Sequence, residues 1–99
     1  MAIYCFDIDG TIFHTSGSDY PNSRPIAERI AVVNQLFDDG HEITLFTARG
    51  TTTGIDWREL TENQLEQWGV RYHRLILGKP HADFYIDDKG LKDSDFFSV

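Results

Sequence analysis

The chain has 99 residues, of which 40% are hydrophobic and 13% are aromatic, so it can build one small globular core. Its formal net charge of −7 counts against nucleic acid, an acidic membrane or a free phosphate ester as a partner, unless a divalent cation or local Lys and Arg side chains assist. Cys5 is the only cysteine, which excludes an internal disulfide and a cysteine-rich metal site.

The only N-terminal apolar run is interrupted by Asp7 and Asp9, so we expect no signal peptide. No apolar stretch approaches the length of a membrane span. The sequence therefore predicts a cytoplasmic protein with no membrane partner.

A short apolar run predicts a buried strand that ends in Asp7-Ile8-Asp9-Gly10-Thr11. Because side chains alternate along a strand, we expect Asp7 and Asp9 to project together with Ile8 between them. Two like charges so close are costly unless a cation joins them or one takes a proton. Nucleophilic catalysis and metal binding both use this arrangement, although the string alone also fits a polar loop with a turn glycine.

Residues 12–24 are polar and rich in turn formers, which indicates a flap over the strand ends. Pro25 then opens a predicted helix that ends near Gly40. Four apolar residues recur at helical spacing on one face of it: Ile26, Ile30, Val33 and Phe37.

A second strand is predicted over residues 43–46, and it ends in Thr47-Ala48-Arg49-Gly50. After a threonine-rich loop, Asp56 and Glu59 fit a capping box at the start of a second helix, which Gly69 ends. We expect its buried face to be apolar, formed by Trp57, Leu60, Leu65 and Trp68.

A third strand is predicted over residues 72–77, followed by the turn Gly78-Lys79-Pro80. A fourth is predicted over residues 84–86, and it ends in Asp87-Asp88. In the tail after residue 88, two phenylalanines, Phe96 and Phe97, indicate docking on the body of the protein.

Strands that alternate with helices predict right-handed β-α-β units and a parallel sheet, in which ligands collect outside the carboxyl ends of the strands. Every unusual polar group of this chain follows a predicted strand. We therefore expect these groups to meet at one edge of the sheet.

In order along the chain, a carboxylate pair, a threonine, a lysine and a second carboxylate pair resemble the four motifs of the haloacid dehalogenase-like (HAD) superfamily. The motif residues are Asp7 with Asp9, Thr47, Lys79, and Asp87 with Asp88. The resemblance covers nearly the whole chain. It implies an α/β fold, namely a Rossmann-like three-layer sandwich with a small, mainly parallel sheet, and a single core domain over residues 1–99.

The intervals between the motifs are filled by single helices and strands. The chain therefore resembles a minimal member of the superfamily without a cap domain. An oligomer would help to complete the edges of so small a sheet.

The resemblance also implies roles. Asp7 would be the nucleophile that forms an aspartyl-phosphate, and Asp9 would be the general acid and base. Thr47 and Lys79 would bind the oxygens of the phosphoryl group. A Mg²⁺ ion, a hard cation that prefers oxygen ligands, would be held by four aspartates: Asp7, Asp9, Asp87 and Asp88.

Substrate contacts are implied at the residues that flank the first two motifs: Gly10, Thr11, Ala48 and Arg49. The guanidinium of Arg49 fits a position over the substrate phosphate. It fits equally well on the surface, paired with an acidic loop.

The function that this reading implies is Mg²⁺-dependent hydrolysis of a phosphomonoester, with a small phosphorylated metabolite such as a sugar phosphate as substrate. The local context is similar to small bacterial capless phosphatases of capsule and lipopolysaccharide pathways. One alternative is a nucleic-acid end phosphatase, against which the net charge counts. Another is a non-catalytic phosphate-binding regulatory module.

Overall fold

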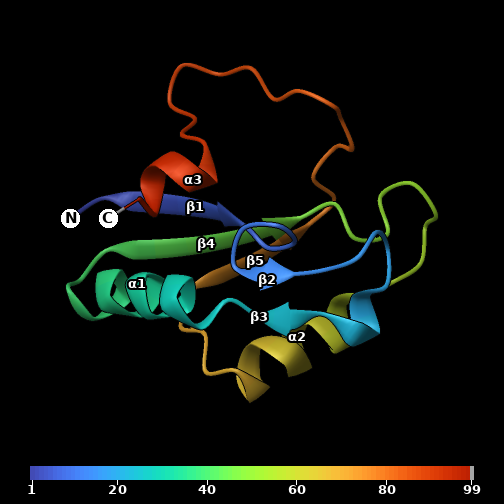
Figure 1. Ribbon diagram of the computed structural model, residues 1–99, viewed down its shortest axis with the longest axis horizontal. Helices are drawn as coiled ribbons and strands as arrows, with labels where there is room; N and C mark the ends of the chain where they lie inside the picture. The colour runs from blue at the N-terminus through green and yellow to red at the C-terminus, as the bar shows by residue number, and fades with distance from the viewer. Residues whose placement is uncertain (99) are drawn as a thin grey trace.

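The computed structural model describes residues 1–98, and it contains a three-stranded parallel sheet in the order β1-β4-β5. Its strands are β1 (Ile3–Asp7), β4 (Glu42–Thr47) and β5 (Arg74–Leu77). The two helices that connect these strands are α1 (Ala27–Asp38) and α2 (Arg58–Gln67). The prediction of an α/β fold with a small parallel sheet flanked by helices is confirmed (Figure 1).

The core forms where the helices meet one face of the sheet. The alternation of β1 and β4 turns Phe6 and Leu45 toward this face, and the register pairs these two residues directly. Helix α1 contributes Ile30 and Val33 at the predicted spacing, and α2 contributes Leu65. The helical periodicity of the sequence was therefore a sound guide to the core.

The opposite face of the sheet is exposed at its two outer strands, whereas Thr44 of the central strand β4 is buried there. The intervening residues of β1 and β5 turn toward it, and three of them, Ile3, Cys5 and Ile76, are exposed. Apolar side chains in contact with water on a parallel sheet are unusual, because both faces of such sheets are normally covered.

A small antiparallel ladder joins the two ends of the predicted flap. Its strands are β2 (Phe13–His14) and β3 (Arg24–Pro25), and between them lies the short 3-10 helix η1 (Tyr20–Asn22). The Tyr20 ring packs edge-on against Trp57, so the flap rests on the start of α2. Within residues 1–98 no inserted domain covers the strand ends.

The tail docks as predicted. Helix α3 (Asp93–Phe96) lies beside β1, on the side away from β4 (Figure 1). Phe96 contacts Tyr4 and Phe6, with ring centroids 6.1 and 5.6 Å apart, and Arg29 of α1 forms an ion pair with Asp93 at 2.6 Å.

The predicted fourth strand does not form. Residues 84–86 belong instead to an extended segment, residues 80–92, which arches away from the body between β5 and α3 (Figure 1). We call this segment the arm. All of its residues are exposed. A strand beside β1 would need a crossover of about a dozen residues from the end of β5, and residues 78–83 are too few to provide one.

Candidate active site

Three of the expected side chains meet at the carboxyl edge of the sheet. Asp7 is the last residue of β1, Thr47 is the last residue of β4, and Lys79 follows β5 after one glycine. Parallel strands end at the same edge, so the pairing register alone brings these positions together.

Asp7 faces Lys79. The Lys79 ammonium lies 3.3 Å from Asp7 Oδ2, and the Ile8 N–H donates to Asp7 Oδ1 at 2.9 Å. The Lys79 side chain is 12% exposed and that of Asp7 is 32% exposed. Burial raises the pKa of Asp7 above its ordinary value, although Lys79 and the Ile8 N–H oppose this change. Asp7 is therefore a partly desolvated carboxylate beside a fixed positive charge.

Thr47 connects this pair to β4. Its side chain is buried, and its hydroxyl oxygen accepts a hydrogen bond from the Arg49 N–H at 3.1 Å. Its carbonyl oxygen accepts bonds from the N–H groups of Gly78 and Lys79, both at 3.1 Å. Thr47 thereby fixes the turn that presents Lys79 to Asp7.

The Lys79 ammonium also lies over two aromatic rings. It is 4.6 Å from the centre of the Phe46 ring and 4.0 Å from that of Tyr85. The Tyr85 hydroxyl donates to the Pro80 carbonyl at 2.6 Å, which closes a turn at the base of the arm. These contacts restrict the ammonium to the neighbourhood of Asp7.

Asp9 forms a separate ion pair with Arg49. The Arg49 Nε donates to Asp9 Oδ2 at 2.9 Å, and Nη2 donates to Oδ1 at 2.8 Å. The Thr15 hydroxyl from the flap adds a third bond to Asp9 at 2.7 Å. Each carboxylate of the first motif thus has its own cation: Lys79 for Asp7, and Arg49 for Asp9.

Arg49 is buried, which rules out the surface position considered from the sequence. Its other donors are bound by Ser23 of the flap and by Thr61 and Gln64 of α2, at distances of 2.7 to 3.3 Å. With Asp9, these acceptors use all five N–H groups of the guanidinium. Arg49 therefore has no free donor for a substrate phosphate in this structure and acts as a positioning residue for Asp9.

The predicted apolar face of α2 was wrong in part for the same reason. Its buried residues are Thr61, Gln64 and Leu65, so two polar side chains occupy the face that packs inward. They are buried because they bind Arg49. No local pattern in the sequence marks Thr61 and Gln64 as inward-facing residues, because polar side chains in a helix usually face solvent.

The residues that flank the first motif are already bonded to the backbone. The Gly10 N–H donates to the Phe13 carbonyl at 2.8 Å, and the Thr11 N–H donates to the Ile8 carbonyl at 3.1 Å. The φ angle of Gly10 is +82°, as expected for the sharp turn after the strand. Ala48 is half-buried between Thr47 and Arg49.

The second carboxylate pair is not at this edge. Asp87 and Asp88 lie in the exposed arm, where Asp87 Oδ1 accepts a bond from the Lys89 N–H at 2.6 Å. Within residues 1–98, no three His, Cys, Asp or Glu side chains are grouped so that they could hold a metal ion. The four expected Mg²⁺ ligands suit the ion chemically, but the chain in this conformation does not assemble them, so it does not fit the ion.

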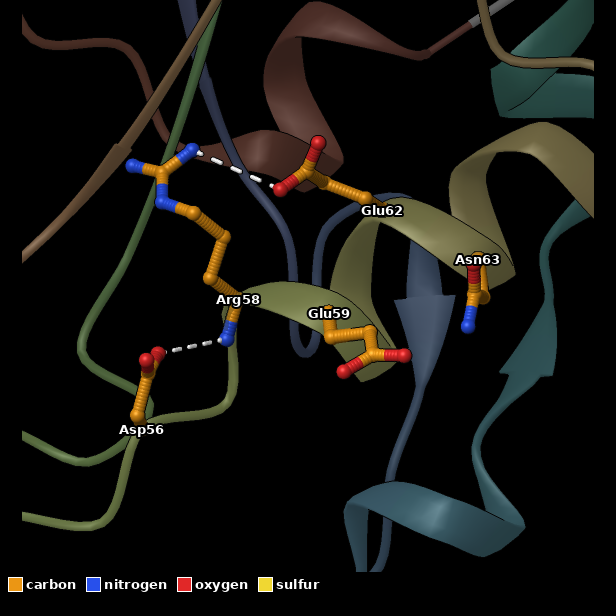
Figure 2. A pocket seen from close by; sticks show the side chains of 5 residues that line it. All are labelled: Asp56, Arg58, Glu59, Glu62 and Asn63. Atoms are coloured by element: carbon orange, nitrogen blue, oxygen red, sulfur yellow. Dashed lines mark hydrogen bonds and ion pairs between the residues drawn. The ribbon is translucent and has the colours of Figure 1, made fainter.

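Surface hollows do not mark the site by themselves. One of about 290 Å³ lies on the outer side of α2, where Asp56 accepts from the Arg58 N–H and Arg58 pairs with Glu62 (Figure 2). Three of its five lining residues are acidic and exposed: Asp56, Glu59 and Glu62. A second, of about 250 Å³, is lined by residues that include Arg49, Gly50, Leu77 and Gly78, and it therefore adjoins the carboxyl edge of β4 and β5.

Gly50 shapes the loop beside that second hollow. Its φ angle is +79°, and a Cβ atom at this position would lie 2.0 Å from the Ile55 carbonyl oxygen. The loop that follows β4 can adopt this conformation only with glycine at position 50.

No protein-family model and no curated protein matches this chain. Among solved structures, a structural-genomics target from Vibrio cholerae is 30% identical, with a TM-score of 0.89 over 100% of this chain and 89% of that one. Among the helices of residues 1–98, none has the length and apolar character that a membrane crossing requires.

Two more distant structures share the fold. A chain of the Pnkp1/Rnl/Hen1 complex is 22% identical, with a TM-score of 0.61 over 98% of this chain. A chain of the Pnkp1/Rnl/Hen1 RNA repair complex is 19% identical, with a TM-score of 0.60 over 97%. This protein spans 33% and 29% of the length of those two chains.

Proposed function

The chain belongs to the same family as the Vibrio cholerae protein, and we propose that it is a phosphomonoester hydrolase of the HAD superfamily that uses Asp7 as its nucleophile. The observation that carries this proposal is the pairing of Asp7 with Lys79 at 3.3 Å at the carboxyl edge of a parallel sheet. A carboxylate nucleophile needs a positive charge beside it, because both it and the incoming phosphate are anionic.

The proposed reaction has two steps. An Asp7 carboxylate oxygen attacks phosphorus, the bond from phosphorus to the ester oxygen breaks, and the leaving alkoxide takes a proton. Water then attacks the phosphorus of the aspartyl-phosphate, which releases inorganic phosphate and restores Asp7. In both steps the Lys79 ammonium would offset the negative charge of the equatorial phosphoryl oxygens, and the Thr47 hydroxyl would donate a hydrogen bond to one of them.

Asp9 is the proposed proton donor and acceptor. Arg49 fixes the orientation of its carboxylate through two hydrogen bonds, and Thr15 attaches the flap to the same group. Proton transfer at the leaving oxygen requires the carboxylate to loosen from Arg49. The proposal therefore links Asp9 chemistry to movement of the flap.

Dependence on Mg²⁺ is part of the proposal. It rests on the resemblance to the superfamily alone, because in this structure Asp87 and Asp88 lie in the exposed arm and the four expected ligands are not assembled. This dependence is tested by removing the metal with a chelator and adding back Mg²⁺.

The assay is release of phosphate from p-nitrophenyl phosphate, followed by a panel of sugar phosphates, nucleotides and phosphorylated amino acids. Asp7→Asn should abolish turnover, and the matched variant Asp39→Asn, an exposed aspartate after α1, should not. A folded wild-type protein that hydrolyses no phosphoester with Mg²⁺ present would favour a phosphate-binding regulatory module.

A nucleic-acid end phosphatase is the second candidate, because the fold recurs in an RNA repair complex. The net charge of −7 opposes it. Faster turnover of end-phosphorylated oligonucleotides than of sugar phosphates would make it the better description.

A further inference from the structure

Gln64 of α2 joins two parts of the molecule, the flap and the ion pair of Asp9 with Arg49. It is 5% exposed, although glutamine is mostly a surface residue. Its Oε1 accepts a hydrogen bond from Arg49 Nη1 at 2.7 Å, and its Nε2 donates to the Tyr20 carbonyl at 2.7 Å. One buried amide therefore connects the residue that aligns Asp9 with the short 3-10 helix of the flap.

The two partners of Gln64 fix the orientation of its amide. A guanidinium can only donate a hydrogen bond and a carbonyl can only accept one, so the amide oxygen must face Arg49 and the amide nitrogen must face Tyr20. Glutamate has nearly the same shape, but its carboxylate can only accept. The position therefore requires a side chain that both accepts and donates.

Two hydroxyl groups also attach the flap to the ion pair. The Thr15 hydroxyl donates to Asp9 Oδ1 at 2.7 Å, and Arg49 Nη2 donates to Ser23 Oγ at 3.3 Å. Thr15 and Ser23 both belong to the flap itself. Within residues 1–98, Gln64 is the only residue outside the flap and the ion pair that hydrogen-bonds to both.

The Tyr20 carbonyl is a central point of the flap. It accepts a second hydrogen bond from the Ser23 N–H at 3.1 Å, which closes the 3-10 helix. The ring of the same residue lies over the guanidinium of Arg49, 4.7 Å from Cζ, and packs edge-on against Trp57. The bond from Gln64 therefore fixes both the backbone of the flap and the ring that covers Arg49.

The alignment of Asp9 depends on where the flap lies. The Arg49 side chain is fully buried, and Asp9 is 23% exposed. Displacement of the flap would remove the Thr15 bond from Asp9 and would uncover the guanidinium beneath Tyr20. Since an ion pair weakens when water reaches it, Asp9 would then be held less firmly.

We propose that Gln64 is a positioning residue: it holds the flap against the Arg49–Asp9 pair and thereby keeps the Asp9 carboxylate aligned with the leaving oxygen of the substrate. Its effect on turnover rests on the proposed function. Its hold on the flap does not, and the two parts are tested separately.

The variant Gln64→Glu breaks one of the two bonds and keeps the other. Its carboxylate, ionised beside a guanidinium, still accepts from Arg49 but cannot donate to the Tyr20 carbonyl. Amide hydrogen exchange, measured by mass spectrometry, should become about 5- to 10-fold faster over residues 15–24, the factor that one hydrogen bond is worth. Exchange in β4 should stay as in the wild type, which shows that the body remains folded.

Two further variants separate the lost bond from the added charge. Gln64→Met has a similar shape and no charge, and it should also speed exchange in the flap. Gln67→Glu makes the same charge change at an exposed position of α2 and should leave exchange unchanged. Wild-type exchange in the flap of Gln64→Glu, or an effect in Gln64→Glu that Gln64→Met lacks, would overturn the proposal.

The effect on Asp9 is measured with two esters that differ in their leaving groups. A sugar alkoxide needs a proton as it leaves, whereas p-nitrophenolate needs little help. For the sugar phosphate that the wild type hydrolyses fastest, Gln64→Glu should lower kcat/KM by about 10-fold, and for p-nitrophenyl phosphate by less than about twofold. A merely structural role would lower both equally, and that result would overturn the assignment.

The two measurements fail in different ways. If the wild-type protein hydrolyses neither ester, the proposed function is wrong, but faster exchange in the flap of Gln64→Glu would still establish that Gln64 holds the flap. If the wild type is active and the flap of Gln64→Glu exchanges as before, the proposed function stands and the role of Gln64 is refuted.

Discussion

Arg49 holds the carboxylate of Asp9 through two nearly parallel hydrogen bonds, from Nε to Oδ2 at 2.9 Å and from Nη2 to Oδ1 at 2.8 Å. The Arg49 side chain is fully buried, and that of Asp9 is 23% exposed. This pair joins the loop after β1, the loop after β4 and the buried face of α2 into one unit. This unit is rigid, because every buried hydrogen-bond donor of Arg49 has an acceptor within it.

The first prediction concerns this pair. Arg49→Lys should lower the free energy of unfolding by about 3 kcal/mol, because one ammonium cannot replace the paired bonds and leaves Thr61 and Gln64 without a donor. Activity should fall as well, with a larger effect on kcat than on KM if Arg49 positions Asp9. Chemical denaturation and steady-state kinetics measure the two effects. Arg58→Lys, at an exposed pair on α2, should change neither.

Lys79→Ala should reduce kcat by about 10²- to 10³-fold while the protein stays folded, since its ammonium is proposed to stabilise the transferring group. Lys79 also lowers the pKa of Asp7. In the variant, the acidic limb of the pH profile of the remaining activity should therefore move to higher pH. Lys92→Ala, an exposed lysine before α3, is the control. An unchanged pH profile would show that Lys79 does not influence the ionisation of Asp7.

Asp7→Asn should leave the protein as stable as the wild type or more stable at neutral pH. Burial raises the pKa of Asp7, so the folded state binds its proton more tightly than the unfolded state does. The ionised carboxylate therefore costs stability, and this cost grows as the pH rises from the unfolded pKa through the folded pKa. Urea denaturation at several pH values measures it. A large loss of stability in this variant would contradict the direction of the shift.

Asp93 should behave in the opposite way. The hydrogen bond from Arg29 lowers its pKa, so its contribution to stability is present above the unfolded pKa and is lost as the pH falls through the folded value. Asp93→Asn should remove this acid-dependent part and loosen α3 from β1. Amide hydrogen exchange at Phe96 would report the loosening.

Gly50→Ala should destabilise the protein by about 2 kcal/mol more than Gly54→Ala does. Both glycines have a positive φ angle, but only at Gly50 would the new Cβ collide with a backbone oxygen, that of Ile55. The difference between the two variants therefore isolates the collision from the cost of the backbone angle. Thermal denaturation of both proteins is sufficient.

The periodic parts of the fold were predictable from the sequence. The spacing of Ile30 and Val33 in α1 reports burial directly, because an amphipathic helix buries one face. The meeting of Asp7 with Lys79 followed from the rule that parallel strands end at the same edge. These conclusions needed no knowledge of side-chain contacts.

Two features could not be read in this way. The buried position of Arg49 depends on acceptors from three separate segments, and no local pattern shows that Thr61 and Gln64 face inward. The strand expected at Phe84 to Ile86 has the right composition, but pairing also requires a connection of sufficient length, which residues 78–83 do not provide. Composition indicates which residues prefer a strand, and chain geometry decides which edge they can reach.

If Asp7 is the nucleophile, it becomes phosphorylated during turnover, and this aspartyl-phosphate can be trapped. Wild-type protein and the Asp9→Asn variant are quenched with acid during turnover and reduced with borohydride, which converts an aspartyl-phosphate to homoserine, and peptide mass spectrometry then locates the converted position. We expect homoserine at position 7 alone, with none in Asp7→Asn. Conversion at a different aspartate, or phosphate release with position 7 never modified in either protein, would contradict it.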